Sequence, residues 1–204
     1  MSEWIIHGAA FLIGGLCPCW IAVKLVTGKD LREEDSGNVG ASNAARSLGM
    51  GKHWFGWIWY FILIILDALK GFCAIKLAES FSTDTSFIAF VGFSAVLGHC
   101  FPIYLKFKRG KGISTTLGVL LSLGFYSELA VFISALVLGL LGTRRPSAAA
   151  LIALATLVLT NIAYGHFTST NAIVCTVVLI VIRHHDNIDR LLKGIEPPLF
   201  NWHN

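Results

Sequence analysis

The chain has 204 residues, of which 55% are hydrophobic and only 14% are charged, and its formal net charge is +4. Soluble domains carry about 25% charged residues, so this composition excludes an ordinary soluble domain and favours one membrane domain over residues 1–204. The five cysteines all fall in apolar stretches, without the spacing of a metal site or a disulfide framework. We therefore expect no metal, no organic cofactor and no nucleic-acid partner.

Apolar runs long enough to cross a membrane follow one another along the chain. A crossing helix needs about 20 predominantly apolar residues, and the first three such runs are 5–23, 54–77 and 86–105. The amino terminus lacks the positive region of a cleavable signal, so we expect the first run to remain as a span. A charge-free run over 146–182 is too long for one crossing, and residues 164–166 supply a natural break within it.

Residues 113–143 form either one long tilted helix or two short helices that turn near 125–128. Two crossings there place 14 of the 16 Lys and Arg residues on the same side of the membrane. Because positive residues gather on the cytoplasmic side, this distribution favours two crossings. We therefore predict an all-α integral membrane protein with seven transmembrane helices, two of them short. The amino terminus lies outside and the carboxyl terminus lies in the cytoplasm.

The first polar cluster follows the first apolar run. It comprises Ser36, Gly37, Asn38, Gly40, Asn43 and Arg46. Its glycines allow the backbone to approach a ligand closely, its asparagines cap helices or donate hydrogen bonds, and its arginine suits a phosphate group. A flexible turn followed by a helix cap explains the same residues, so the cluster alone leaves both interpretations open.

The second polar cluster follows the third apolar run and comprises Lys108, Gly110, Lys111 and Gly112. Glycines that expose backbone N–H groups beside lysines are typical of sites for phosphate oxygens. The pattern is not a Walker A motif, because Leu105 stands where that motif needs glycine and Gly112 directly follows the lysine. Nucleotide hydrolysis therefore gains no support, and a basic loop attracted to anionic lipid headgroups remains the alternative.

The third polar cluster begins where the last apolar run ends. His184 can act as an acid, a base or a hydrogen-bond partner near neutral pH, and Asn187 follows it by about one helical turn. A solvated amphipathic tail that also contains Arg190 and Lys193 explains these residues equally well. The predicted topology places all three clusters on the cytoplasmic side, where they would together bind a phosphate compound.

Two further polar features lie inside the apolar runs. Asp67 and Lys70 are three residues apart near the middle of the second run, where an unpaired charge costs at least about 2.5–3.5 kcal/mol. We expect them to form an ion pair, although such residues could instead mark a proton or substrate path. His99 lies near the inner end of the third run, and we expect it to orient the second cluster rather than perform chemistry.

Taken together, the polar stretches resemble the integral-membrane glycerol-3-phosphate acyltransferases of bacteria that use acyl phosphate. The matching stretches are 37–46, 66–71, 98–102, 107–112 and 183–188. Two positions depart from the family pattern: Arg109 replaces a usual glycine, and Ser42 replaces a usual threonine. The resemblance implies a seven-helix protein of the bacterial inner membrane whose active site faces the cytoplasm.

The resemblance also implies the reaction and its residues. A fatty acyl group would pass from acyl phosphate to the 1-hydroxyl of glycerol 3-phosphate, giving lysophosphatidate and phosphate. The implied catalytic residues are Ser36, Arg46, Lys111, His184 and Asn187. The implied phosphate-binding residues are Gly37, Asn38, Gly40, Asn43, Lys108, Gly110 and Gly112. Because acyl phosphate has a good leaving group, no covalent enzyme intermediate is required, and we expect the substrate's own phosphate to accept the proton while His184 mainly binds.

Two other functions remain open at this point. A small organophosphate transporter would need a site near mid-membrane between repeats, whereas the glycine clusters lie at one edge and no repeat is visible. An acyltransferase of the same fold that uses acyl-CoA would need room for a nucleotide, and the sequence indicates no adenine pocket.

Overall fold

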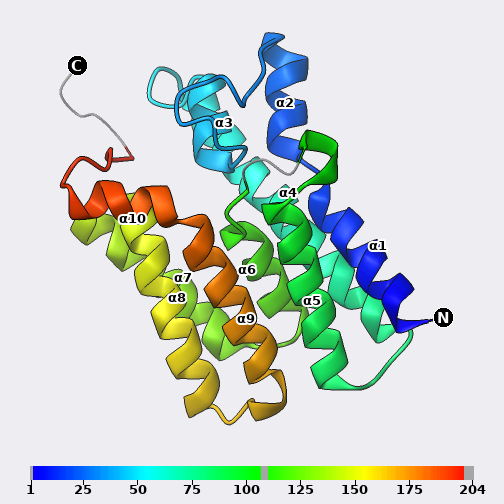
Figure 1. The fold of residues 1–204 in the computed structure, drawn as a ribbon. Helices are drawn as coiled ribbons and strands as arrows, with labels where there is room; N and C mark the ends of the chain where they lie inside the picture. Colours follow the sequence, from blue (N-terminus) through cyan, green and yellow to red (C-terminus); the bar gives the residue numbers. More distant parts are fainter. Residues whose placement is uncertain (1, 107–109, 200–204) are drawn as a thin grey trace.

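The computed structural model describes residues 2–106 and 110–199, and all regular structure in these ranges is helical. The longer helices are α1 (Glu3–Gly15), α4 (Trp54–Glu79), α5 (Thr85–Cys100), α7 (Tyr126–Thr143), α8 (Pro146–Ala163) and α9 (Phe167–Arg183). The shorter ones are α2 (Pro18–Thr27), α3 (Ala41–Ser47), η1 (Ile103–Leu105), α6 (Ile113–Ser122) and α10 (His185–Leu192). The longer helices form a bundle, with α3 and α10 at the end opposite the amino terminus (Figure 1).

Five helical segments of the described chain are long and apolar enough to cross a membrane. They are Glu3–Thr27, Trp54–Glu79, Thr85–Leu105, Tyr126–Thr143 and Pro146–Ala163. The pair of α9 and α10, bent by 59° at His184, makes a sixth if it counts as one span. Large apolar side chains on these helices are exposed, as expected for residues that face lipid; examples are Phe61, Ile65, Leu138, Leu141 and Leu159.

The predicted breaks are mostly confirmed. Residues 113–143 form two helices, and residues 164–166 separate α8 from α9. The first of these turns covers 123–125, slightly before the predicted 125–128. Of the two helices expected to be short, α7 has 18 residues and only α6, with 10 residues, is too short to span. At 1.5 Å per residue α6 extends about 15 Å, roughly half the hydrocarbon thickness of about 30 Å.

The predicted span over 5–23 lies within the observed segment Glu3–Thr27, but this segment consists of two helices rather than one. Helix α1 ends at Gly15, and α2 begins at Pro18 after an extended Leu16. A proline has no backbone N–H and is favoured at the first position of a helix, so Pro18 starts a new helix rather than continuing the old one. The break leaves backbone carbonyls at the end of α1 that need partners inside an apolar environment.

Small residues allow the helices to approach closely. A side chain on Gly14 of α1 would clash with the backbone of Ala95 in α5, and one on Gly98 of α5 would clash with the backbone of Phe11 in α1. In membrane proteins such contacts replace the hydrophobic driving force, because lipid tails are as apolar as the side chains. The pairs α1–α5, α4–α6 and α7–α8 pack against each other over much of their lengths.

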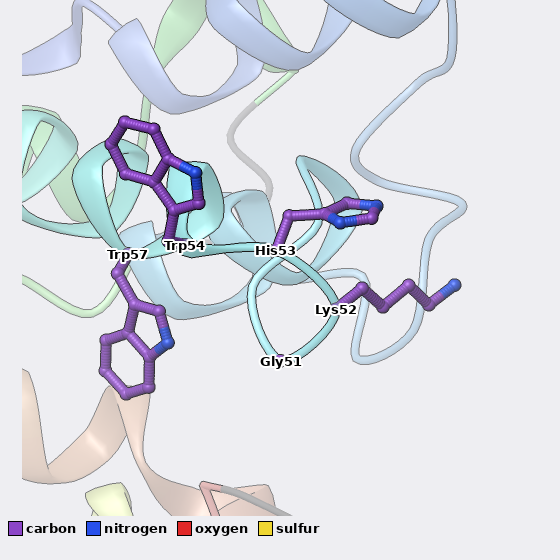
Figure 2. Close-up of a pocket in the computed structure, with 5 residues that line it drawn as sticks. All are labelled: Gly51, Lys52, His53, Trp54 and Trp57. Carbon is purple, nitrogen blue, oxygen red and sulfur yellow. The ribbon is translucent and has the colours of Figure 1, made fainter.

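An open pocket of about 330 Å³ lies where α4 begins. It is lined by Gly51, Lys52, His53, Trp54 and Trp57. In Figure 2 the two indoles lie on one side of the turn, whereas the side chains of Lys52 and His53 point to the other. Tryptophans beside basic residues are typical of the membrane–water interface, which indicates that this end of α4 lies at headgroup level.

Candidate active site

Three segments far apart in the sequence lie at the same end of the helix bundle (Figure 1). They are the loop that precedes α3, the segment 110–112 that precedes α6, and the junction of α9 and α10. Each contains one of the polar clusters predicted from the sequence. Lys108 and Arg109 lie outside the described residues, so the second cluster is represented by Gly110, Lys111 and Gly112.

Lys111 lies in a concentrated positive field. Burial lowers its pKa from 10.5 to about 8; the carboxylate of Glu196 opposes this shift, and the nearby guanidinium groups of Arg190, Arg46 and Arg183 add to it. These contributions bring residues of all three clusters within electrostatic reach of one lysine. A buried lysine that lies close to several arginines is suited to bind a multiply charged anion such as a phosphate ester.

The glycines on either side of Lys111 have distinct roles. Gly112 has a φ of +84° and is the N-cap of α6, so it makes a turn that other residues adopt only with strain. The carbonyl oxygen of Gly110 accepts a hydrogen bond of 3.1 Å from Nε of Arg183. The Arg183 guanidinium also lies 5.0 Å from the centre of the Phe101 ring. The backbone next to Lys111 is therefore held by Arg183 at the end of α9, and Arg183 is itself positioned by Phe101 at the end of α5.

His184 is buried at the junction of α9 and α10. Its Nδ1 lies 2.8 Å from the carbonyl oxygen of Ile180, and a carbonyl only accepts, so Nδ1 carries the proton and Nε2 is left as an acceptor. Burial lowers the pKa of His184 to about 4, and the charge of Lys111 contributes in the same direction. The imidazole is therefore neutral at pH 7 and offers Nε2 to a hydroxyl donor.

Asn187 is held by a buried carboxylate that sequence reasoning missed. Glu196 accepts hydrogen bonds of 2.6 Å each from Ser147, Asn187 and Arg190. Burial alone raises the pKa of Glu196, but the three hydrogen bonds and the Arg190 charge outweigh it and bring the pKa below its ordinary value of 4.5. Glu196 joins the start of α8 to α10, and no local motif could indicate this, because Ser147 is 49 residues away.

The segment after α10 also contacts α3 and the turn that follows it. The backbone N–H of Leu199 donates to the carbonyl of Arg144 at 2.9 Å, and the Leu199 side chain is buried with Ala45 and Met50. Arg145 donates to the Gly194 carbonyl at 3.3 Å. The carboxyl-terminal segment thus joins the start of α8 to the α3 region.

In the first cluster, Asn43 is a loop-holding residue. Its buried side-chain amide donates to the carbonyls of Leu31, Glu34 and Asn38 at 3.3, 3.0 and 2.9 Å. Both N–H bonds of the amide are therefore used within the protein, and its oxygen, an acceptor, is unsuited to a phosphate. The side-chain N–H groups of Asn43 therefore shape the loop that contains Gly37 and Gly40, and the phosphate contact predicted for Asn43 stays a prediction.

Arg46 projects from α3 and pairs with Asp35 at 2.6 Å. Both side chains are partly exposed, and Asp35 has an unfavourable φ of +43°. Ser36, next to this aspartate, is exposed, and its Oγ lies 3.4 Å from the backbone N–H of Asn38. The ion pair with Asp35 orients the Arg46 guanidinium and engages only part of its five N–H donors.

Arg46, Lys111, His184 and Asn187, which the sequence placed in three separate segments, thus meet around one region. Within residues 2–106 and 110–199, no three His, Cys, Asp or Glu side chains are arranged to hold a metal ion. A region with several cations, a neutral histidine acceptor and an asparagine, at the end of an apolar bundle, is suited to bind an anionic headgroup at the membrane surface.

Comparison with known proteins identifies the class and then the family. The model of the family described as glycerol-3-phosphate acyltransferase matches residues 4–194. A glycerol-3-phosphate acyltransferase from Thermotoga petrophila is 35% identical over 198 residues and 96% of each chain. One from Bartonella henselae is 38% identical over 200 residues, 96% of this chain and 90% of the relative.

The crystal structure of PlsY (YgiH), an integral membrane glycerol 3-phosphate acyltransferase, superposes in its glycerol 3-phosphate form with a TM-score of 0.87. The two sequences are 33% identical, and the match covers 98% of this chain and 96% of that one. The lysophosphatidic acid form gives a TM-score of 0.84 at 32% identity. The protein is an integral membrane acyltransferase by class. It belongs to the glycerol-3-phosphate acyltransferase family represented by PlsY.

The triple hydrogen bond to Glu196 generates the first prediction. Replacing Glu196 by Ala leaves two buried donors, on Ser147 and Asn187, and the partly exposed Arg190 without this partner. We therefore expect the free energy of unfolding to fall by about 3 kcal/mol. Because its folded-state pKa lies below 4.5, ionised Glu196 stabilises the protein above that pH, and the contribution disappears as the pH falls through the folded-state value. Thermal unfolding in detergent from pH 7 to 3 measures both effects.

Asp189→Ala supplies the control for this prediction, since Asp189 is an exposed acid on α10, the helix that precedes Glu196. It should unfold as the wild type does at every pH. Equal stability of Glu196→Ala and Asp189→Ala at pH 7 would contradict the structural role of Glu196.

Proposed function

We propose that the protein transfers a fatty acyl group from acyl phosphate to the sn-1 hydroxyl of glycerol 3-phosphate, giving lysophosphatidic acid and inorganic phosphate. The observation that carries this proposal is the convergence of Arg46, Lys111 and Arg190 beside the neutral His184. Two phosphates must be held close together for this reaction, and their repulsion is the main barrier to positioning them. The relatives' bound glycerol 3-phosphate and lysophosphatidic acid support the same acceptor and product.

In the proposed reaction the sn-1 hydroxyl oxygen attacks the acyl carbonyl carbon. A new carbon–oxygen ester bond forms, and the bond between that carbon and the phosphate oxygen breaks with its electron pair going to phosphate. The site supplies orientation and charge neutralisation rather than a covalent intermediate. Lys111, with the N–H groups of the segment 110–112, and Arg46 neutralise the phosphates, and Ser36 and Asn38 orient one of them.

The leaving phosphate accepts the hydroxyl proton in this proposal. His184, with a pKa of about 4, is a weak base at neutral pH, whereas the oxygen atoms of the departing phosphate gain negative charge, and so become stronger bases, as the bond to the acyl carbon breaks. The Nε2 acceptor of His184 instead receives a hydrogen bond from the attacking hydroxyl and aims its oxygen at the carbonyl carbon. Asn187, fixed by Glu196 at 2.6 Å, flanks the same region and contributes a polar contact.

We also propose that the chain crosses the bacterial inner membrane seven times and that the polar clusters face the cytoplasm. Because α6 is too short to span by itself, it makes one of these crossings together with the segments on either side of it. A cysteine-labelling experiment tests this topology. In a background without the native cysteines, Thr83→Cys should react with a membrane-impermeant maleimide in spheroplasts from intact cells, and Lys193→Cys should react only after permeabilisation. The reverse labelling pattern, or labelling of both sites without permeabilisation, would refute the orientation.

The donor and acceptor are tested with purified protein reconstituted in lipid. Labelled glycerol 3-phosphate is offered with palmitoyl phosphate or with palmitoyl-CoA, and we expect lysophosphatidic acid from the acyl phosphate alone. Lys111→Met should lower kcat/KM by about a hundredfold or more, the size seen when one preorganised charge donor is lost. His184→Ala should raise the KM for glycerol 3-phosphate more than it lowers kcat.

The other results of this assay separate the alternatives. Product from palmitoyl-CoA alone would retain the acyltransferase and overturn the donor. Flux of glycerol 3-phosphate across sealed vesicles without any product would support a transporter. Loss of turnover in His184→Ala with unchanged affinity for both substrates would make His184 the base.

The lowered pKa of Lys111 predicts a pH dependence. The ammonium group is lost as the pH rises through about 8 rather than 10.5, so the KM for glycerol 3-phosphate should rise by roughly tenfold per pH unit above that value. Lys111→Arg keeps its charge to much higher pH, and its KM should stay flat up to pH 10. A rise of the same size in both proteins would assign the titration to another group.

A further inference from the structure

A buried ionic cluster lies beneath the active site and takes no direct part in the proposed reaction. The ammonium of Lys70 contacts Oδ1 of Asp67 at 2.7 Å, the carbonyl oxygen of Leu16 at 2.7 Å and Nδ1 of His99 at 2.9 Å. Asp67, Lys70 and His99 are each at least nine-tenths buried. An ammonium group has three N–H donors, so every donor of Lys70 is engaged, and the ion pair predicted from the sequence is confirmed with two further partners.

The contact with Leu16 explains how the break in the first span is tolerated. The carbonyls at the end of α1 carry the negative end of the helix dipole, and Pro18 supplies no N–H that could satisfy them. The Lys70 ammonium donates a hydrogen bond to one of these carbonyls, which thereby gains the partner that backbone in a membrane requires. Lys70 therefore ties together the ends of α1 and α5 from its position in α4.

The contact with His99 connects Lys70 to the segment 110–112 of the active site. Because Lys70 donates to Nδ1, that nitrogen carries a lone pair and the proton lies on Nε2. The opposite edge of the ring lies against Gly110: a Cβ on Gly110 would come within 2.8 Å of Nε2 and 2.7 Å of Cδ2 of His99, and it would also clash with the His99 carbonyl. Gly110 directly precedes Lys111, so the imidazole forms part of the surface on which the lysine backbone rests.

Stability alone does not account for this cluster. A buried ion pair costs so much desolvation that apolar residues of similar size often serve the fold equally well, and charges in a membrane span are typically retained for function. The chain contains a direct comparison in the pair of Lys76 and Glu79. That pair has the same spacing on the same helix and the same length of 2.7 Å, but it is exposed and makes no contact with the 110–112 segment.

We propose that Lys70 is a positioning residue. It fixes the orientation of the His99 ring, against which Gly110 packs, and thereby sets the position of Lys111 in the phosphate site. Asp67 holds the Lys70 ammonium in place and balances its charge. The effect on substrate binding rests on the proposed function, whereas the effect on Lys111 itself does not. The two can therefore be tested separately.

The test uses a double variant that removes both charges together, Asp67→Asn with Lys70→Met, so that neither is left unpaired in the membrane. The matched control is Glu79→Gln with Lys76→Met. A second variant, His99→Phe, keeps a ring beside Gly110 but loses the hydrogen bond to Lys70. Thermal unfolding in detergent shows whether the double variant folds. If it does not fold, His99→Phe is used to test the proposal.

The first readout is the pH dependence of Lys111 acetylation, followed by mass spectrometry, which needs no enzyme activity. The midpoint should lie near pH 8 in the wild type and in the control. In the double variant it should move toward 10.5, because a lysine no longer held in its buried position gains hydration. His99→Phe should move in the same direction by a smaller amount.

The second readout is the kinetics with glycerol 3-phosphate and palmitoyl phosphate. The KM for glycerol 3-phosphate should rise about tenfold in the double variant, since a small displacement of a binding group has effects of this order or larger, while the KM for the donor changes less. A folded double variant with an unchanged Lys111 midpoint and an unchanged KM would show that the cluster only stabilises the bundle, and would overturn the proposal. A wild type without activity but with the expected shift in midpoint would retain it and refute the proposed function instead.

Discussion

The constraint on which the rest of the site depends is the pairing of buried charge at one end of an apolar bundle. The charges of Arg46, Arg183 and Arg190 act on Lys111, which burial partly removes from solvent screening, while Arg46 and Arg190 are partly exposed and paired with carboxylates. Glu196 is the nearby carboxylate that balances this field, and it satisfies three donors at once. With Glu196 in place the cations remain concentrated without unfolding the junction, and the excess positive charge is left for an anionic substrate.

The same requirement acts at the break in the first span. Irregular backbone is tolerated in a membrane only where other groups satisfy it, and the Lys70 ammonium does so for Leu16. The polar group that repairs the break also contacts His99, which lies against the loop of Lys111. Lys70 therefore serves two purposes: it satisfies a backbone carbonyl inside the membrane, and it helps to position the loop of Lys111.

Much of the helical layout was predictable, because length and hydropathy are local properties of the chain. The break at 164–166, the two helices within 113–143 and the pair of Asp67 and Lys70 were all expected and are observed. The break at Leu16 was missed, although Pro18 within an apolar run was a usable signal. The loop contacts of Asn43 were not predicted, since the amide chemistry that suits a phosphate suits three loop carbonyls equally well.

The sequence by itself determined a helical membrane protein, the order of its apolar runs and the chemistry of three polar clusters, because each follows from short stretches of residues. Only the tertiary structure decided which partners those clusters have: Glu196 with Ser147, Arg46 with Asp35, and His99 with Gly110. These contacts depend on how helices pack against each other. Packing depends on the shapes of whole surfaces, which no local pattern of residues records.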